Sequence, residues 1–298
     1  MPRRYLKHDL RTLTRVSSAG LITLPEVARA LELPARQATL RMARIVSQGW
    51  ARRVRRGVYL LIDVKTPGPE AARVPGPDEL AQALFAPCYV GGWSAARYWG
   101  IGGANRIAKF VVTAARVRHT NVNTEGFRFH LVHVPRERIE APGIVNLEYR
   151  RSRISDQART IVDALCDPSW IGGAIRLANA YERYWKSELW DEYYFAEVMQ
   201  AVGTGAAYKR LGAIGKEKDA TAGRAYRDGF VRRTAGVIDL DPAKPTVRPV
   251  RSVWGVRLNV DLNDQYTLPP DGEEEYEEEE ELDLPEDFIE GVDDYDDP

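Results

Sequence analysis

The sequence contains very little cysteine and no long apolar run. Its two cysteines, Cys88 and Cys166, form no C-x-x-C pair, which argues against a disulfide-rich scaffold and against the common thiol-based zinc and redox motifs. Neither a signal peptide nor a membrane-spanning segment is visible in the sequence. We therefore expect two buried, reduced thiols in a soluble cytoplasmic protein that has no membrane partner.

The small net charge hides a strong separation of charge along the chain. The formal net charge is −1, yet residues 1–65 carry fourteen Lys and Arg against four Asp and Glu. Residues 271–298 carry seventeen Asp and Glu and no Lys or Arg. A basic head of this kind is typical of proteins that bind nucleic acid. The acidic end is too charged to form a packed core, so it is predicted to be a disordered tail.

The first 62 residues predict three helices followed by a β-hairpin. Helices are expected at 3–16, 24–31 and 34–48, with Thr23 capping the second and Pro34 starting the third. Two strands then flank Arg55-Arg56-Gly57, where the glycine favours a turn. This order of elements is the plan of a winged helix-turn-helix.

Proline-rich stretches set the predicted domain boundaries. Two Pro-Gly-Pro units lie between residues 67 and 77, and Pro269-Pro270 precedes the acidic segment. The predicted fold class is therefore a multi-domain α+β protein with a winged helix-turn-helix at the N-terminus. Its parts are a winged helix-turn-helix DNA-binding domain over 1–63, a linker over 64–78, a mixed α+β domain over 79–270 and a disordered acidic tail over 271–298.

The third predicted helix has one apolar side and one polar side. Helical spacing places five residues on a side expected to be buried: Ala35, Ala38, Met42, Ile45 and Val46. The other side carries candidate DNA contacts, with Arg41 at its flank: Arg36, Gln37, Leu40 and Arg44. Arginine pairs bidentately with guanine, glutamine pairs with adenine, and leucine can contact a thymine methyl. We expect this face to contact base edges of double-stranded DNA.

The predicted hairpin concentrates positive charge on both of its faces. Four arginines lie around one valine: Arg52, Arg53, Arg55 and Arg56. Like charges at this density repel one another, but a DNA phosphate backbone would neutralise them. All four are therefore candidate phosphate contacts.

The middle of the chain predicts a mixture of strands and helices. Strands are expected at 88–90, 110–113, 127–134, 144–149 and 253–262, and helices at 78–85, 94–99, 155–165, 172–187, 191–202 and 204–214. Ser94 and Ser155 are interpreted as helix caps. The aromatic run from Tyr181 to Phe195 is expected to be mainly core, although exposed rings there would form a protein-binding patch.

The same region offers no convincing catalytic group, metal site or cofactor motif. Gly92-Trp93-Ser94-Ala95-Ala96 lacks the second glycine of a nucleophile elbow. His130 and His133 are expected on opposite faces of a strand, so they could not chelate one metal ion. Asp156 and Asp163 lie two helical turns apart, too far for a tight carboxylate pair. We predict a protein that is not an enzyme and needs no cofactor.

Three stretches together resemble the AbiEi family of antitoxins. They are residues 53–59 of the hairpin, residues 89–101 and residues 154–165. The resemblance spans about residues 5 to 215 and implies a transcriptional autorepressor that binds inverted repeats in its operator. It also implies a second domain that helps neutralise a cognate nucleotidyltransferase toxin, in a type IV toxin–antitoxin system. It assigns Arg53, Arg55 and Arg56 to DNA contact and brings no catalytic residue.

Two hypotheses from other classes stay open on the sequence alone. A metal-dependent nuclease could be assembled from acidic residues far apart in the chain, with the winged helix directing it to DNA. A ligand-responsive repressor without a toxin could instead hold an effector in its middle domain.

Overall fold

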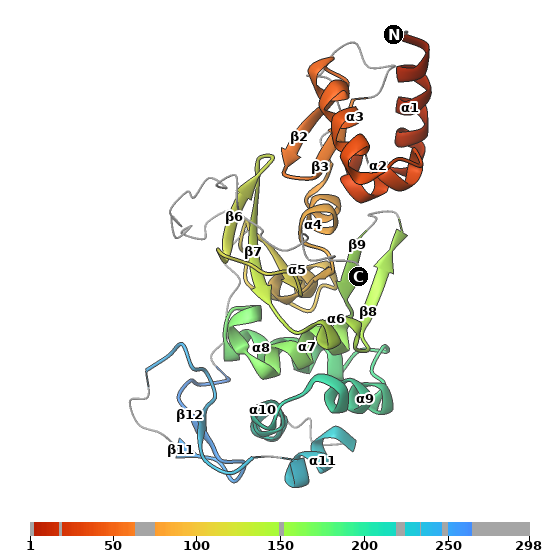
Figure 1. The fold of residues 1–298 in the computed structure, drawn as a ribbon. Coiled ribbons are helices and arrows are strands. Elements are labelled where there is room, and N and C mark those ends of the chain that lie inside the picture. Colours follow the sequence, from red (N-terminus) through yellow and green to blue (C-terminus); the bar gives the residue numbers. More distant parts are fainter. Residues whose placement is uncertain are drawn as a thin grey trace.

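The computed structural model describes residues 3–17, 20–62, 75–148, 152–218, 224–232, 234–245 and 250–263. The molecule is a mixed α+β protein, with an N-terminal unit at one end, a six-stranded sheet in the middle and a helical layer below it (Figure 1). Most of the predicted linker and the whole predicted acidic tail lie outside the described residues. Every helix in the described ranges is too short or too polar to cross a lipid bilayer.

The N-terminal unit contains the predicted helices and the predicted hairpin. Its elements are α1 (Arg3–Val16), β1 (Leu21–Thr23), α2 (Leu24–Ala30), α3 (Ala35–Ser47), β2 (Ala51–Arg55) and β3 (Val58–Leu61). The three strands form an antiparallel sheet in the order β1-β3-β2. Leu13, Val27 and Ile45 each have no exposed surface and join the three helices in one core.

The middle of the molecule is a six-stranded mixed sheet in the order β6-β7-β5-β4-β9-β8. Its strands are β4 (Cys88–Val90), β5 (Lys109–Thr113), β6 (Asn121–Thr124), β7 (Phe127–His133), β8 (Ile144–Leu147) and β9 (Ser152–Ser155). The short helices α4 (Pro77–Phe85), α5 (Gly92–Tyr98) and α6 (Arg136–Glu140) connect or cover these strands. β6 and β9 were not predicted, because both are short and polar and owe their conformation to their neighbours in the sheet.

Two predicted helix caps were wrong. Ser155 ends β9, and the cap of α7 (Gln157–Cys166) is Asp156, whose Oδ1 accepts a hydrogen bond from the Arg159 backbone N–H at 2.8 Å. Ser94 lies inside α5, and its Oγ accepts from the Phe110 backbone N–H at 2.9 Å. Both serines could cap a helix, but Ser155 is part of a strand and Ser94 hydrogen-bonds to the backbone of one.

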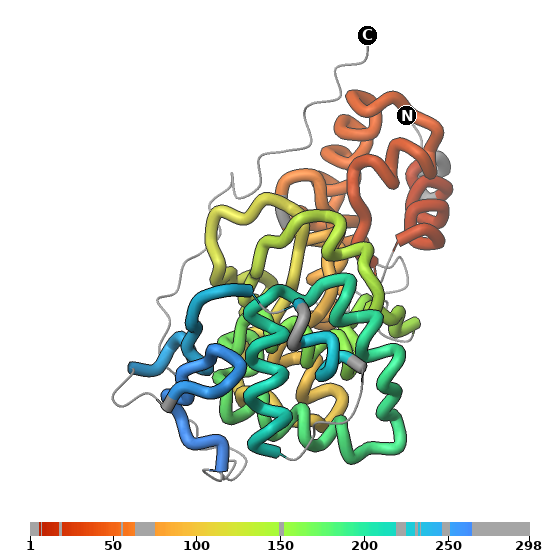
Figure 2. The backbone as a smooth tube through the Cα atoms, turned by 90° about the horizontal axis from the view of Figure 1, so that it is seen from below, coloured from red at the N-terminus to blue at the C-terminus, as the bar shows by residue number. Residues whose placement is uncertain are grey.

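A helical layer covers one side of the sheet. It consists of α7, a 3-10 turn (Pro168–Ile171), α8 (Ala174–Trp185), α9 (Glu192–Val202), α10 (Gly205–Glu217) and α11 (Arg224–Arg232). Seen from below in Figure 2, the green and teal helices lie in front of the strands. The aromatic run is mainly core, as predicted: Tyr181, Tyr184 and Phe195 are buried in the same cluster. Only Leu189 and Tyr193 are about two-thirds exposed there.

A small sheet packs on the far side of this layer. It contains β10 (Ile238–Asp239), β11 (Val250–Arg251) and β12 (Val256–Leu258), so the strand predicted at 253–262 is much shorter than expected. Trp254 inserts its ring against Gly212 of α10, where a Cβ atom would lie 2.0 Å from the ring. The indole therefore depends on a glycine at this position to reach the core.

The two cysteines are free thiols. Cys88 is fully buried and donates to the Ala81 carbonyl, and burial raises the pKa of its thiol to about 12. Cys166 is half-buried. A thiol with the environment of Cys88 is unreactive at neutral pH.

Candidate nucleic-acid interface

The outer face of α3 exposes the side chains predicted to meet DNA. Arg36, Gln37, Leu40 and Arg44 are all exposed, and Leu40 is 64% exposed, whereas Ala38, Met42 and Ile45 on the other side are buried. Ala35 was predicted to be buried but is exposed, because it is the first residue of the helix and extends past the core. Of the other residues predicted to be buried, Ala38, Met42 and Ile45 are buried, and Val46 is half-buried.

Local hydrogen bonds fix the start of α2 and the turn that leads from α2 to α3. Thr23 and Glu26 form a capping box: the Thr23 N–H donates to Glu26 Oε2 at 2.8 Å, and the Glu26 N–H donates to Thr23 Oγ1 at 3.4 Å. Glu32 adopts a left-handed φ of 51° in the turn, and the Leu33 N–H returns to the Ala28 carbonyl at 2.9 Å. α3 is thus held at a defined angle to α2.

Arg41 lies at the flank of α3 and is paired inside the unit. Its Nη1 lies 3.0 Å from Asp9 Oδ2 of α1, and the Arg41 side chain is 33% exposed. The contact joins the middle of α1 to the middle of α3, two helices that pack on the same core. The structure thus gives Arg41 a place between α1 and α3 rather than on the open face with Arg36 and Arg44.

Two of the three hairpin arginines whose side chains the structure describes are exposed to solvent. Arg53 and Arg56 are exposed, and Gly57 turns the chain with a φ of 75°. The strand register shifts between Arg53 and Arg55, so Val54 bulges and packs against a core cluster. The Arg55 backbone pairs with Val58, while its side chain lies outside the described part of the structure.

Arg52 is used inside the molecule. Its two terminal guanidinium nitrogens both donate to the Glu125 carboxylate in the β6–β7 turn, one of them at 2.6 Å. The hydrogen bond with Glu125 raises the pKa of Arg52. A carboxylate 73 residues away therefore occupies the fork that was predicted to hold a phosphate. No sequence signal links these two residues.

The N-terminal unit also shares a hydrophobic core with the middle sheet. Leu21, Val58 and Leu60 from β1 and β3 pack in one cluster with Leu84 and Phe129. Together with the Arg52–Glu125 pair, this cluster joins β1 and β3 to α4 and β7. The three-stranded sheet that contains the hairpin therefore packs against one hydrophobic cluster on each of its two faces.

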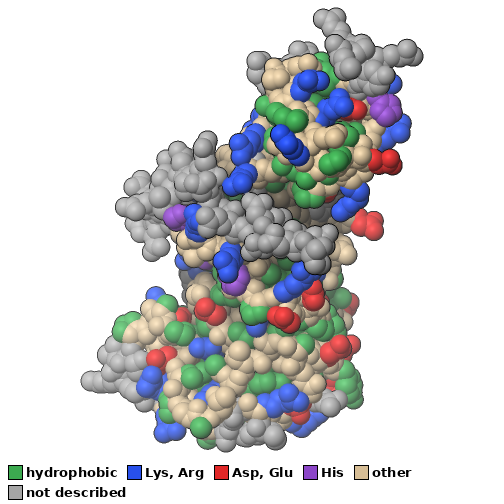
Figure 3. All heavy atoms as spheres, in the orientation of Figure 1, with side chains coloured by type: hydrophobic (Ala, Val, Ile, Leu, Met, Phe, Trp, Pro, Cys, Tyr) green, Lys and Arg blue, Asp and Glu red, His purple; other side chains and the backbone are tan. Residues whose placement is uncertain are grey.

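The outer side of α3 and the hairpin both carry exposed cationic side chains. Figure 3 shows Lys and Arg side chains on the visible side of the N-terminal unit, next to exposed hydrophobic ones. We call this surface, defined by Arg36, Gln37, Leu40, Arg44, Arg53 and Arg56, the basic face. Positive charge beside exposed hydrogen-bonding groups is suited to phosphate and base contacts.

A buried polar cluster in the second part of the molecule was not found from the sequence. The Asp163 carboxylate accepts hydrogen bonds from Tyr89 Oη at 2.7 Å, Arg138 Nη2 at 2.6 Å and Arg159 Nε at 3.0 Å. Asp163 and Arg159 have no exposed surface. Burial raises the pKa of the Tyr89 phenol, which keeps its proton for Asp163. With its carboxylate saturated and sealed from solvent, Asp163 acts as a structural group.

The histidines and acidic residues lie apart from one another. His130 hydrogen-bonds Asn121 at 2.8 Å, and burial lowers its pKa, whereas His133 is exposed. The Asp156 carboxylate accepts a hydrogen bond from the Tyr194 hydroxyl, away from Asp163. Across the residues that the structure describes, no group of three or more His, Cys, Asp and Glu side chains has an arrangement able to hold a metal ion.

Comparison with known proteins yields a likeness of fold. No protein-family profile matches the sequence, and no curated protein is significantly similar to it. Among solved structures, the crystal structure of the Rv2827c protein from Mycobacterium tuberculosis is similar, with a TM-score of 0.50 and 13% sequence identity. The alignment covers 86% of this chain and 92% of that chain. At this identity the likeness concerns the fold alone.

Proposed function

We propose that this protein is a double-stranded DNA-binding transcriptional repressor whose N-terminal unit is a winged helix-turn-helix. The observation that carries the proposal is the basic face: an α3 surface of Arg36, Gln37 and Arg44, exposed beside a basic hairpin. In this arrangement α3 enters the major groove, and the hairpin follows the adjacent backbone as the wing. The turn with Glu32 sets the angle of α3, and the shared core sets the position of the hairpin.

The two parts of the basic face have different roles. Arg36, Gln37 and Arg44 carry donors and acceptors suited to base edges, so they supply sequence discrimination. Arg53 and Arg56 lie on the hairpin, where a phosphate contact supplies affinity without discrimination. Binding to inverted repeats in an operator would place two copies of α3 in successive major grooves.

Wing variants test this division of roles. Arg53→Ala combined with Arg56→Ala is expected to weaken binding to all duplexes alike, because two phosphate contacts are lost. The slope of log K against log salt should become shallower by about 2, since each phosphate contributes about −0.9. Fluorescence anisotropy over a salt series measures both effects. A loss confined to one duplex sequence would show instead that the wing contacts bases or responds to groove shape.

The proposal extends to antitoxin activity through the resemblance to AbiEi antitoxins. We expect the adjacent gene to encode a nucleotidyltransferase that arrests growth, and co-expression of this protein to restore growth. Arg36→Ala combined with Arg44→Ala should still restore growth, because the resemblance assigns antitoxicity to the second domain. Growth curves with an inducible toxin measure this. An adjacent gene without such a toxin would reject the antitoxin function while leaving DNA binding intact.

Deleting the acidic residues 271–298 tests whether their negative charge affects DNA binding. They carry seventeen negative charges, so deleting them leaves a strongly basic chain. If the acidic segment competes with DNA, its deletion should tighten binding at about 50 mM salt and have less effect at about 200 mM. A full-length chain with these carboxylates replaced by Gln and Asn separates charge from length. Equal affinities for all three proteins would exclude competition.

A further inference from the structure

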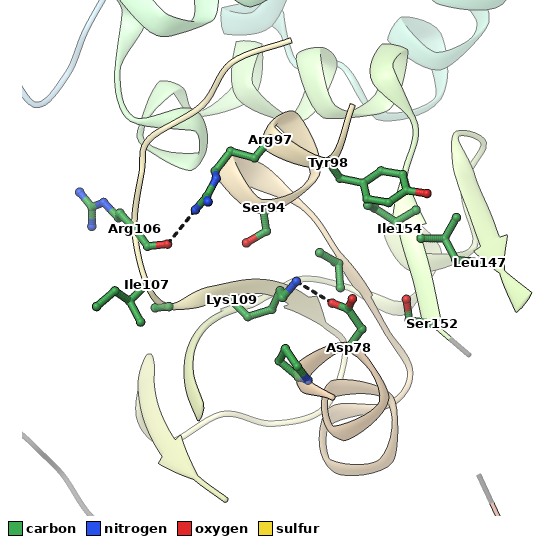
Figure 4. A pocket seen from close by; sticks show the side chains of 13 residues that line it. Asp78, Ser94, Arg97, Tyr98, Arg106, Ile107, Lys109, Leu147, Ser152 and Ile154 are labelled. Atoms are coloured by element: carbon green, nitrogen blue, oxygen red, sulfur yellow. Dashed lines mark hydrogen bonds and ion pairs between the residues drawn. The ribbon is translucent and has the colours of Figure 1, made fainter. Parts of the chain in front are cut away.

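A pocket of about 410 Å³ lies on the middle sheet, on the side of α5 (Figure 4). The start of α4, one side of α5, the residues before β5 and parts of β4, β8 and β9 form its walls. Its volume falls within the range usual for small-molecule sites. Its lining includes the charged side chains of Asp78, Arg97, Arg106 and Lys109 and the hydroxyls of Ser94 and Ser152.

The cationic groups of the pocket leave it with an excess of positive charge. Lys109 Nζ lies 2.7 Å from Asp78 Oδ1, so these two charges neutralise each other. Arg97 is exposed, and its Nη1 donates a long hydrogen bond, 3.3 Å, to the Arg106 carbonyl. The Arg106 guanidinium lies over the Trp93 ring at 4.8 Å and points away from the other labelled side chains. Within the described part of the chain, the charge of Arg97 therefore faces the pocket without a carboxylate in hydrogen-bonding reach.

Two serine hydroxyls add hydrogen-bonding capacity. Ser152 is only 5% exposed, yet its Oγ has no hydrogen-bond partner among the described residues. Burying a hydroxyl in this way is unfavourable unless something in the pocket completes its bonding. Ser94 Oγ accepts from the Phe110 N–H at 2.9 Å, and this oxygen points toward the space between Arg97 and Lys109 in Figure 4. Both hydroxyls can donate to an anionic oxygen.

The wall opposite Arg97 and Ser94 is mainly apolar. Tyr98, Leu147 and Ile154 lie together on one side of the pocket, as Figure 4 shows. The Arg97 guanidinium and the Ser94 hydroxyl lie at one end, and an aromatic ring with aliphatic side chains lies at the other, next to the Ser152 hydroxyl. Such a lining is suited to an anionic group joined to a flat or apolar body.

We propose that this pocket binds an organic phosphate monoester of mononucleotide size. Arg97 holds the phosphate with help from Lys109 and the hydroxyl of Ser94, and the organic part packs on Tyr98, Leu147 and Ile154, where the Ser152 hydroxyl can donate to one of its polar atoms. Phosphate suits this set because it offers several acceptor oxygens to donors that converge from different elements. The inference does not depend on DNA binding by the N-terminal unit, since no residue of the basic face lines the pocket.

Isothermal titration calorimetry on the full chain tests the proposal with three probes: AMP, inorganic phosphate and adenosine. AMP is expected to bind most tightly, and adenosine at least tenfold more weakly, because it lacks the anionic group. Arg97→Gln should weaken AMP binding about tenfold or more, as expected for losing a charged hydrogen bond. Arg227→Gln, at an exposed arginine of α11, is the matched control and should bind AMP like the unmodified protein.

A second variant keeps the test independent of Arg97. Ile107 is 60% exposed at the rim of the pocket, so Ile107→Glu adds a negative charge without disturbing the core and should also weaken AMP binding. Thermal unfolding of both variants verifies that they are folded. Absence of AMP binding at millimolar concentration, equal affinities for AMP and adenosine, or unchanged affinity in Arg97→Gln would each overturn the proposal.

Discussion

Replacing Asp163 with alanine is expected to destabilise the protein by about 3–5 kcal/mol, the cost of removing one partner from a buried ion pair. Asp163 is completely buried, and its carboxylate is the acceptor for Arg159, Arg138 and Tyr89. Without it, the Arg159 guanidinium stays in the interior with no counter-charge at its Nε. Urea unfolding at neutral pH measures the free energy of unfolding.

The cluster also predicts how the loss can be partly reversed. Arg159→Met combined with Asp163→Ala removes the uncompensated charge, so the double variant should be less destabilised than the sum of its two single variants. Glu197→Ala, at an exposed carboxylate of α9, is the control and should change the free energy of unfolding by no more than about 0.5 kcal/mol. A cost below about 1 kcal/mol for Asp163→Ala would contradict the structural role assigned to this carboxylate.

Loss of both arginines from the outer face of α3 is expected to abolish sequence-specific DNA binding. Each bidentate arginine–guanine pair contributes about 1–3 kcal/mol of discrimination, so Arg36→Ala with Arg44→Ala should reduce operator affinity by roughly 30-fold or more. Both side chains are exposed, and the buried side of α3 is untouched, so the variant should stay folded. Binding to a non-specific duplex should fall much less.

This experiment requires a duplex that the protein prefers, selected from a random pool or taken from the region upstream of its own gene. Arg183→Ala, at an exposed arginine of α8, removes one positive charge far from the basic face and serves as the control. Electrophoretic mobility shifts against the selected and a scrambled duplex give the specificity ratio. An unchanged ratio in the double variant would move sequence recognition away from α3.

Much of the N-terminal unit could be predicted from local sequence signals. Thr23 with Glu26 marks the start of α2, and Gly57 marks the turn of the hairpin. The spacing of Ala38, Met42 and Ile45 correctly gave the buried side of α3, and hence the exposed side. These signals succeed because they act over one or two turns of chain, where the backbone geometry is already set.

The same kind of reasoning failed where strands meet. β6 and β9 carry little apolar pattern and exist because β7 and β8 supply their hydrogen bonds. Ser94 and Ser155 have the right chemistry for helix caps, but the sheet uses them for other contacts. A residue that suits two roles is assigned by its neighbours in space, and these are not visible in the sequence.

The sequence by itself determined the mixed α+β class, the charge separation and the two sides of α3, because each follows from composition or from the helical period. Only the tertiary structure decided which partner individual charged side chains have. It pairs Arg52 with Glu125, Arg41 with Asp9 and Arg138 with Asp163. It also brings Arg97, Lys109 and Ser152 around one pocket. The physical reason is that a charged side chain pairs with an opposite charge that folding brings close to it in space. The distance between two residues along the chain does not reveal which of them will meet.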